Sequence, residues 1–355
     1  MAHQSLYRAY RPASFSDVIG QEHVTAPLED AVKTKRIGHA YLFAGSRGLG
    51  KTSVARIFAQ AIGCTPNDLY EIDAASNNSV EDIRSLTEGV YTLPFESPYK
   101  VYILDEAHML SKSAWNAFLK TLEEPPAYAV FILATTELEK VPKTVQSRCQ
   151  VFEFRKPSRQ VLAKTVTVVA KKEGYALTSD AAELIALLAE GSYRDALSVL
   201  QKVLRPLEEA SAASGVSKDN PAALSREDVE SLTGAPKREQ VLSFVAALSE
   251  GDRGAALAII ERASHADVDM RLFLELVIET LRATLLIRYA PELHAALKDE
   301  LGTDDFAVLE VEAKKEQGIT HRTLLAFLAA TEHVRYAPIP ALPLELAVLE
   351  LFSDK

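Results

Sequence analysis

The sequence predicts a doubly wound parallel α/β domain followed by purely helical domains. Three observations support this fold class. Apolar, strand-like runs alternate with amphipathic, helix-like runs up to about residue 157, as in parallel sheets covered on both faces. A glycine-rich loop lies between the first strand-like run and a helix-like run, at residues 45–52. From Ser158 onward helical periodicity continues and no convincing strand appears.

The overall composition is that of an ordinary globular protein. The chain has 355 residues, enough for two or three domains, with 48% hydrophobic and 25% charged residues. No apolar stretch reaches the roughly 18–20 residues of a membrane helix, and the N-terminus lacks the pattern of a secretory signal. Two cysteines cannot make a disulfide framework, so we expect a cytoplasmic protein without membrane contact. The net charge of −10 argues mildly against nucleic-acid contact, although a local basic stripe could provide it.

The elements follow from these patterns in chain order. Strands are predicted at Ala40–Ala44, Leu69–Asp73, Tyr99–Leu104, Val130–Thr135 and Val151–Phe154. Helices are predicted at Ser53–Ile62, Ser113–Leu122, Val161–Glu173, Ser179–Glu190, from Ser192, and at Ser225–Leu232, Glu239–Ser249, Arg253–Ser264 and Met270–Tyr289. We therefore expect three domains, at 1–157, 158–232 and 236–355. Residues 209–223, rich in Ser, Ala and Gly, are predicted to form a flexible loop in the second.

The glycine-rich loop has the form G-x-x-x-x-G-K-[ST]. It consists of Gly45, Ser46, Arg47, Gly48, Leu49, Gly50, Lys51 and Thr52, and Ser53 follows in the helix. Glycines let backbone N–H groups turn toward phosphate oxygens, and the helix N-terminus adds partial positive charge. Lys51 would reach the β- and γ-phosphates, and the Thr52 hydroxyl would bind Mg²⁺. The flanking strand and helix favour this interpretation over a chance glycine-rich turn.

Two carboxylates end the third predicted strand. Asp105 at the strand tip could hold Mg²⁺, directly or through water, and Glu106 could polarise the water that attacks the γ-phosphate. An acidic surface turn is the alternative. The next strand ends near Thr136, whose hydroxyl could orient that water, although threonines end many strands through β-propensity alone.

Two arginines could neutralise phosphate charge. Arg148, just before the last predicted strand, could act on the nucleotide of a neighbouring subunit. A solvated surface arginine is the alternative. Arg194 lies near the N-terminus of the helix from Ser192, where a cation is unfavourable to the helix dipole, which suggests a phosphate partner. A simple ion pair with a carboxylate is the alternative for Arg194.

These motifs, in this order, resemble those of the AAA+ ATPases and, more closely, the gamma/tau subunit family of the bacterial DNA polymerase III clamp loader. The resemblance spans residues 7–200, in the runs Tyr7–Pro12, Phe15–Gln21, Ile72–Ser76, Asp105–Leu110, Leu119–Pro126, Ser147–Cys149 and Gly191–Leu197. Beyond residue 236 the likeness is only in length and helical character. It implies an AAA+ P-loop core at 1–157, a helical lid at 158–232 and a helical collar at 236–355 that holds a ring of five subunits.

The resemblance also implies roles for individual residues. The adenine would lie among Tyr10, Arg11, Pro12, Val18 and Ile19. Asp105 would hold Mg²⁺ and Glu106 would activate water. Thr136 falls at the sensor-1 position, Arg194 at sensor 2, and Arg148 at the finger that acts on the adjacent subunit's ATP.

The activity implied by the resemblance is ATP hydrolysis with Mg²⁺ in an assembly that opens the sliding clamp and places it on primed DNA. Expected partners are the clamp, the delta and delta-prime subunits, further copies of the chain, and primed DNA. DNA phosphates would meet Arg84, Lys120 and Lys140, although Lys120 and Lys140 could be merely solvated. The neutral run Ala75–Ser79, where relatives are often basic, predicts weak phosphate neutralisation and a shallow salt dependence.

The sequence departs from the family pattern in two places. Members usually carry four zinc-binding cysteines between the helix after the phosphate loop and the second strand, but here only Cys64 remains, followed by Thr65–Asp68. One thiol cannot make a tetrahedral zinc site, so we predict no zinc and a short loop. The sequence also stops at Lys355 without the C-terminal extension of the longer family form, so we expect a short form.

Alternative functions belong to other classes. A catalytically silent scaffold similar to the delta-prime subunit would lack a working phosphate loop, and the intact Lys51, Thr52, Asp105 and Glu106 argue against it. A replication factor C small subunit or a branch-migration motor is a further alternative, against which the runs at 105–108 and 122–126 argue. Family members can be grouped with DNA polymerases through their holoenzyme, but we find no carboxylate constellation for nucleotidyl transfer.

Overall fold

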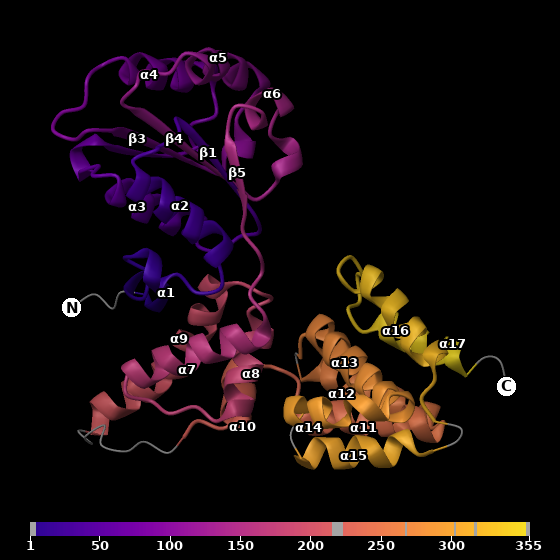
Figure 1. The fold of residues 1–355 in the computed structure, drawn as a ribbon. Helices are drawn as coiled ribbons and strands as arrows, with labels where there is room; N and C mark the ends of the chain where they lie inside the picture. The colour runs from indigo at the N-terminus through magenta and orange to yellow at the C-terminus, as the bar shows by residue number, and fades with distance from the viewer. Residues whose placement is uncertain (1–4, 215–222, 267, 302, 316–317, 353–355) are drawn as a thin grey trace. The chain divides into compact units, whose positions relative to one another are not determined.

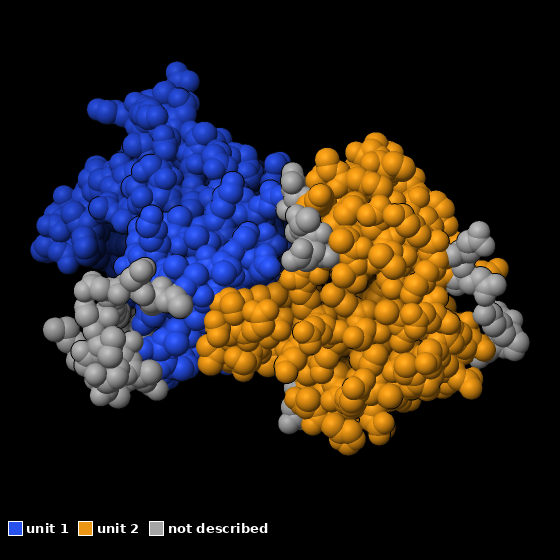
Figure 2. All heavy atoms as spheres, turned by 90° about the horizontal axis from the view of Figure 1, so that it is seen from below, with its two compact units in different colours: residues 1–224 blue, residues 225–355 orange. Residues whose placement is uncertain are grey.

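The chain forms two compact units, residues 1–224 and 225–355, which we describe separately (Figure 2). The structure is a computed structural model that describes residues 5–214, 223–266, 268–301, 303–315 and 318–352. Unit 1 contains a parallel sheet and helices, whereas the elements of unit 2 are all helical (Figure 1). The predicted boundaries after residues 157 and 232 lie within these units and remain predictions.

The sheet of unit 1 has five parallel strands in the order β2-β3-β4-β1-β5. The strands are β1 (Ala40–Ala44), β2 (Leu69–Asp73), β3 (Lys100–Asp105), β4 (Ala129–Thr135) and β5 (Gln150–Glu153). The central strands β1 and β4 are buried throughout, as their continuous apolar runs predict, and the edge strands β2 and β5 are half-exposed. The predictions for β1 and β2 are confirmed, and the bounds of the other three strands differ from prediction by one residue.

Helices cover both faces of this sheet (Figure 1). On one side lie α2 (Glu22–Thr34) and α3 (Lys51–Ala61), and on the other α4 (Val80–Val90) and α5 (Lys112–Glu123). Because side chains alternate along a strand, Tyr41 and Phe43 of β1 pack with Phe58 of α3 in one core, and Leu42 packs with Phe118 of α5 in the other. The short α6 (Lys143–Gln146) precedes β5.

The register in which the strands pair places the ends of β1, β3 and β4, which carry predicted site residues, at the same edge of the sheet. Ala44, the last residue of β1, lies opposite Thr135 of β4, and Asp73 of β2 lies opposite Asp105 of β3. Parallel strands bring their carboxyl ends together, so the loops after β1, β3 and β4 emerge side by side. In open α/β sheets this edge is where ligands bind.

A buried carboxylate holds the loop between α4 and β3. Asp68, at the end of the 3₁₀ turn η2 (Pro66–Asp68), accepts the backbone N–H groups of Phe95, Glu96 and Ser97 at 2.6, 3.0 and 2.8 Å. Burial alone would raise the pKa of Asp68, but these hydrogen bonds outweigh it and lower the pKa to about 2. The side chains of Leu93 and Phe95 in this loop are exposed.

Replacing Asp68 by Asn is expected to lower the unfolding free energy by about 2 kcal/mol at pH 7. The folded-state pKa lies below the unfolded value of 3.8, so this stabilisation is present above pH 4 and disappears as the pH falls toward 2. Urea unfolding of wild type and Asp68→Asn at pH 7 and pH 3 measures it, with the exposed Asp30→Asn as control. An equal cost at both pH values would contradict this account of Asp68.

Three helices complete unit 1: α7 (Arg159–Lys172), α8 (Ser179–Leu188) and α9 (Tyr193–Ser214). The N-terminal segment, with α1 (Leu6–Ala9) and the 3₁₀ turn η1 (Phe15–Asp17), lies against them. The Leu6 N–H donates to Gln201 at 3.0 Å, and the Tyr10 hydroxyl donates to Glu173 at 2.6 Å. These two hydrogen bonds connect the N-terminal segment, which precedes the sheet in the sequence, to the helices that follow the sheet.

The predicted loop over residues 209–223 is wrong in its first part. Helix α9 contains Pro206 and continues to Ser214, while residues 215–222 lie outside the described part of the chain. Residues 208–213, Glu-Glu-Ala-Ser-Ala-Ala, include three alanines and two glutamates, which favour helix, and the single serine did not outweigh them. The loop prediction gave too much weight to small residues.

Unit 2 is a bundle of helices. They are α10 (Arg226–Thr233), α11 (Arg238–Glu250), α12 (Arg253–His265), α13 (Met270–Tyr289), α14 (His294–Leu301), α15 (Thr303–Ala313), α16 (His321–Val334) and α17 (Leu342–Leu351), with the 3₁₀ turn η5 (Pro291–Leu293). Phe244 lies edge-on to Phe273 and Phe327, at ring separations of 5.5 and 5.6 Å, and these buried rings form the centre of the bundle. Ser225 and Asp228 form the predicted capping box of α10.

Candidate nucleotide-binding and hydrolysis site

The phosphate loop joins β1 to α3 through glycines in the left-handed region. The φ angles of Gly45, Gly48 and Gly50 are 145°, 77° and 93°, which L-side chains adopt at a cost. Gly50 is the N-cap of α3 and supplies no side-chain acceptor, so the first N–H groups of the helix stay available for an anion.

A cavity of about 530 Å³ opens beside this loop. Its walls include all the predicted nucleotide contacts except Gly45 and Ser46: Tyr10, Arg11, Pro12, Val18, Ile19, Arg47, Gly48, Leu49, Gly50, Lys51, Thr52, Ser53, Asp105 and Arg194. The catalytic candidate Glu106 also lines it. Residues far apart in the chain thus converge on one cavity, as a nucleotide site requires.

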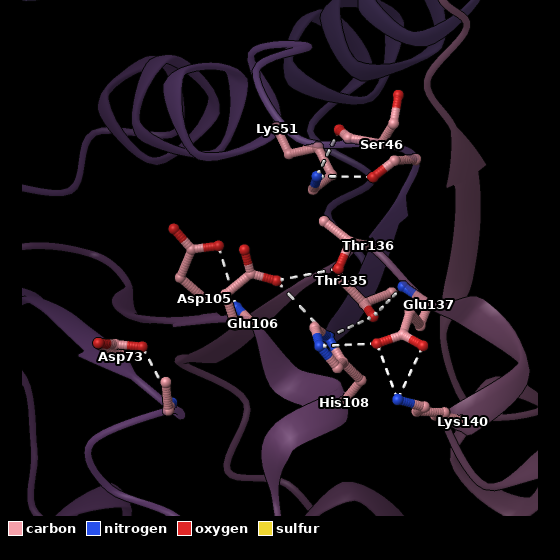
Figure 3. A network of polar contacts seen from close by, with 12 residues as sticks. Ser46, Lys51, Asp73, Asp105, Glu106, His108, Thr135, Thr136, Glu137 and Lys140 are labelled. Carbon is pink, nitrogen blue, oxygen red and sulfur yellow. Dashed lines mark hydrogen bonds and ion pairs between the residues drawn. The ribbon is translucent and has the colours of Figure 1, made fainter. Parts of the chain in front are cut away.

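Lys51 is buried and points its ammonium group into the loop (Figure 3). The Nζ atom donates to the carbonyl oxygens of Gly45 and Ser46 at 2.7 and 2.9 Å. Burial lowers the pKa of Lys51, and the nearby charges of Glu106 and Asp105 act in the opposite direction. Gly45 and Ser46, which do not line the cavity, turn these two carbonyl oxygens toward the lysine.

A hydroxyl and a carboxylate meet where Mg²⁺ is predicted. The Thr52 hydroxyl donates to Asp105 Oδ2 at 2.8 Å, joining the start of α3 to the end of β3. Hydroxyl, carboxylate and phosphate oxygens are the ligands that Mg²⁺ prefers. These two residues therefore fit an ion that is brought in with a nucleotide.

Glu106 occupies an unusual backbone conformation. Its φ of 49° and ψ of 42° place a non-glycine residue in the left-handed region, directly after β3. Its N–H donates to Asp105 Oδ1 at 3.0 Å, and its carboxylate accepts from the Thr136 hydroxyl at 3.3 Å. Strain of this kind is often retained at functional sites. Here it accompanies a carboxylate held between the phosphate loop and the predicted sensor residue.

Sequence reasoning missed three polar residues beside Glu106. His108 lies 3.5 Å from Glu106 Oε2, contacts the Thr135 hydroxyl at 3.2 Å, and lies 3.3 Å from Glu137 (Figure 3). The available signal was position: His108 follows the two carboxylates in one run, and Thr135 and Glu137 follow the neighbouring strand. Their proximity depends on the pairing of β3 with β4, which the sequence does not state.

The helices after the sheet close the other side of the cavity. Arg194 lies with its guanidinium 4.8 Å from the centre of the Tyr7 ring, and no described carboxylate forms an ion pair with it. The Tyr193 hydroxyl donates to the Ile19 carbonyl at 2.7 Å, and burial raises the pKa of Tyr193 to about 12. Tyr7, Tyr193 and Leu197 are further lining residues that sequence reasoning did not single out.

The phosphate loop contacts the start of α9 directly. The Tyr193 N–H donates to the Gly48 carbonyl at 3.1 Å. A methyl group added at Gly48 would lie 1.9 Å from the Ser192 hydroxyl oxygen, whereas one added at Gly50 would meet no atom within 4 Å. Glycine is required at Gly48 by this close approach as well as by its φ angle.

We expect Gly48→Ala to lower the unfolding free energy of the nucleotide-free protein by about 1 kcal/mol more than Gly50→Ala. Both positions have positive φ angles, 77° and 93°, so both variants carry left-handed strain, and the contact with Ser192 is the additional cost at Gly48. Urea unfolding without nucleotide measures both. Equal losses would mean that α9 does not contact the loop in solution.

Comparisons with known proteins agree with this geometry. Residues 20–79 and 67–158 match the family model described as DNA polymerase III, delta subunit. Residues 224–355 match the model described as DNA polymerase III subunits gamma and tau domain III. The tau subunit of Bacillus subtilis is 39% identical over 84% of this chain and 54% of its own length, and that of Escherichia coli K12 is 34% identical over 99% and 56%.

The chain belongs to the gamma/tau subunit family of DNA polymerase III. It spans about half the length of these curated relatives. As a gamma/tau family member it has the AAA+ fold: the RuvB Holliday junction branch migration motor of Thermotoga maritima superposes with a TM-score of 0.52 at 18% identity, over 92% of this chain and 98% of that one. None of the described helices is long and apolar enough to span a bilayer.

Besides Gly45 and Ser46, the predicted sensor residue Thr136 and four predicted basic residues of this gamma/tau family chain do not line the cavity. Arg148 is 34% exposed and pairs with Glu123 at the end of α5. Arg84 and Lys120 are exposed on α4 and α5 and have no ion-pair partner among the described residues, while Lys140 pairs with Glu137. Because Arg148 does not line its own cavity, a role on phosphate would have to be exerted on another subunit.

The zinc prediction concerns the connection between α3 and β2. Residues 62–68 form this connection, and Cys64 is buried in the core beneath α3. Cys149 packs against the core on the opposite face of the sheet. No three His, Cys, Asp or Glu side chains converge on a metal-ion site within the described ranges. The absence of zinc remains a prediction.

Proposed function

We propose that this chain is an ATP-hydrolysing motor subunit of the replicative clamp loader, which opens the sliding clamp and loads it on primed DNA. One observation carries this proposal: the phosphate loop, Lys51, the Thr52–Asp105 pair and Glu106 converge on one cavity with the predicted adenine contacts. A scaffold has no need to retain this complete set of groups.

Each residue has a role in the proposed reaction. Backbone N–H groups of the loop and the Lys51 ammonium bind the β- and γ-phosphates, and Tyr10 to Pro12 with Val18 and Ile19 contact the adenine. Glu106, oriented by Thr136, accepts a proton from the attacking water. Arg194, which lacks a described carboxylate partner, turns from Tyr7 to the γ-phosphate.

Thr52 and Asp105 would hold the Mg²⁺ that accompanies ATP. When bound, this ion neutralises charge on the β- and γ-phosphates. We propose no zinc in this chain, since a lone buried Cys64 offers one thiolate where four ligands are needed.

The proposed partners are the clamp, primed DNA, the delta and delta-prime subunits and further copies of this chain, in the bacterial cytoplasm. Exposed apolar side chains on α16, α17 and their connection support an oligomerisation role for unit 2: Leu325, Leu328, Tyr336, Ile339 and Leu346. Arg148 would then reach the γ-phosphate bound to a neighbouring subunit, and Arg84, Lys120 and Lys140 would contact DNA phosphates.

A catalytically silent scaffold is the second candidate, favoured by the match of residues 20–158 to the delta subunit model. Three measurements test the motor function, and hydrolysis in the reconstituted assembly separates it from the scaffold. A motor binds a fluorescent ATP analogue as the isolated chain, co-purifies with the clamp and other loader subunits when a slowly hydrolysed analogue is present, and hydrolyses ATP faster when clamp and primed DNA are added. A chain that binds nucleotide but never hydrolyses it in the reconstituted assembly would be the scaffold.

A further inference from the structure

One face of helix α7 lies along the N-terminal segment that carries the predicted adenine contacts. A methyl group added at Gly20 would lie 3.8 Å from a methyl group of Val161, near the start of α7. At the end of the helix, the Lys172 ammonium lies 5.6 Å from the centre of the Tyr10 ring. Positions 161 and 172 are about three helical turns apart and therefore share a face. Thr165, about one turn after Val161, lies on this face between them.

Thr165 contributes a hydroxyl to the cavity wall, and the hydrogen of that hydroxyl is already used. The residue is half-buried and lines the cavity together with Tyr10, Val18 and Ile19. Its Oγ1–H donates to the Val161 carbonyl oxygen, one helical turn back, at 2.8 Å. A hydroxyl carries one donor hydrogen and two acceptor lone pairs. The capacity that Thr165 retains for a ligand is therefore that of an acceptor.

Other polar groups near the predicted adenine contacts are bonded to one another. The Tyr10 hydroxyl donates to Glu173 at 2.6 Å, and the Ile19 carbonyl accepts the Tyr193 hydroxyl at 2.7 Å. Asp17, a further lining residue, accepts three hydrogen bonds at Oδ2 from the two residues that precede its 3₁₀ turn. The threonine on α7 differs from these groups, because its only described hydrogen bond is the one it donates within its own helix.

We propose that Thr165 is a specificity-determining residue that selects adenine over guanine. The two purines differ at position 6, where adenine carries an amino group that donates hydrogen bonds and guanine carries an oxygen that accepts them. A hydroxyl oxygen whose hydrogen is held by Val161 accepts from the adenine amino group but is repelled by the guanine oxygen. To donate to guanine, the hydroxyl must give up its bond to the Val161 carbonyl. This proposal rests on the proposed function, because it takes the cavity to hold a nucleoside triphosphate.

The test measures the affinity of the full chain for nucleotides rather than its turnover. A ribose-labelled fluorescent ATP analogue is bound first, and unlabelled ATP or GTP then displaces it. Thr165→Val keeps the shape of the side chain but removes the acceptor, so it should weaken ATP binding about fivefold and leave GTP binding unchanged. Thr165→Ser, which retains the hydroxyl, should keep the wild-type preference for ATP.

A second threonine on the same helix provides the matched control. The Thr167 hydroxyl makes the same kind of bond, to the Ala163 carbonyl oxygen at 2.8 Å, but the residue is exposed and does not line the cavity. Thr167→Val therefore loses an equivalent hydrogen bond within α7 without changing the cavity wall. It should bind ATP and GTP with wild-type affinities.

Purine riboside triphosphate, which has neither an amino group nor an oxygen at position 6, isolates the proposed contact. It should bind wild type and Thr165→Val equally well, whereas ATP distinguishes them. A wild type without preference for ATP over GTP, or equal losses of ATP and GTP affinity in Thr165→Val, would overturn the proposal. A chain that selects ATP through Thr165 but never hydrolyses it in the reconstituted loader would support this proposal and contradict the proposed motor function.

Discussion

Replacing Glu106 by Gln is expected to reduce the rate of ATP hydrolysis at least about 10²-fold, because an amide cannot accept the proton of the attacking water. Nucleotide affinity should change little, since Gln keeps the size of the side chain and can still contact the Thr136 hydroxyl. Turnover at saturating ATP and titration with a fluorescent ATP analogue measure the two quantities separately.

Two further variants complete this experiment. Glu139→Gln, an exposed carboxylate in the turn after β4, is the matched control and should retain full turnover. Lys51→Ala should abolish turnover through lost affinity, because the ammonium group that the loop holds at Gly45 and Ser46 is removed. Undiminished turnover in Glu106→Gln would remove Glu106 from its proposed role.

Replacing Arg148 by Ala is expected to slow hydrolysis in the assembled loader by about 10³-fold, at the lower end of the effect of such arginines. The affinity of each subunit for ATP should stay nearly unchanged, because Arg148 does not line the cavity of its own chain. Reconstituted assemblies containing only the variant copy, compared by steady-state hydrolysis and nucleotide titration, provide the measurement.

The isolated chain gives the discriminating control for Arg148. Its slow hydrolysis should be the same with and without Arg148→Ala, since no neighbour is present to receive the arginine. Arg36→Ala, which removes an exposed arginine on the connection after α2, should affect neither preparation. Normal hydrolysis by the assembled Arg148→Ala loader would show that the arginine does not act across subunits.

Local patterns were sufficient to predict most of the sheet and the phosphate loop. Continuous apolar runs located β1 and β2 with their observed bounds, because a strand buried on both faces tolerates few polar residues. β3 reaches one residue further than predicted, since Asp105 continues the ladder opposite Asp73. An aspartate side chain at the end of a strand does not reveal whether the backbone of that residue is still paired with the neighbouring strand.

Composition was less reliable where helix propensity and turn propensity compete. Residues 209–214 were predicted as loop, but α9 extends through them. Alanine has the highest helix propensity, and a helix already formed at residues 193–208 needs no new nucleation to continue. The loop prediction counted residue types without considering the helix that precedes them.

The sequence by itself located the glycine-rich loop at 45–52 between a strand and a helix, and Asp105 and Glu106 at the end of the third strand, because backbone freedom, charge and strand ending are properties of neighbouring residues. Only the tertiary structure decided that Ser192 packs against Gly48, and that His108 joins Glu106 to Glu137. Those contacts join residues separated by up to 144 positions, from 48 to 192. Strand order and helix packing bring these residues together, and neither can be predicted from the local sequence pattern of a single segment.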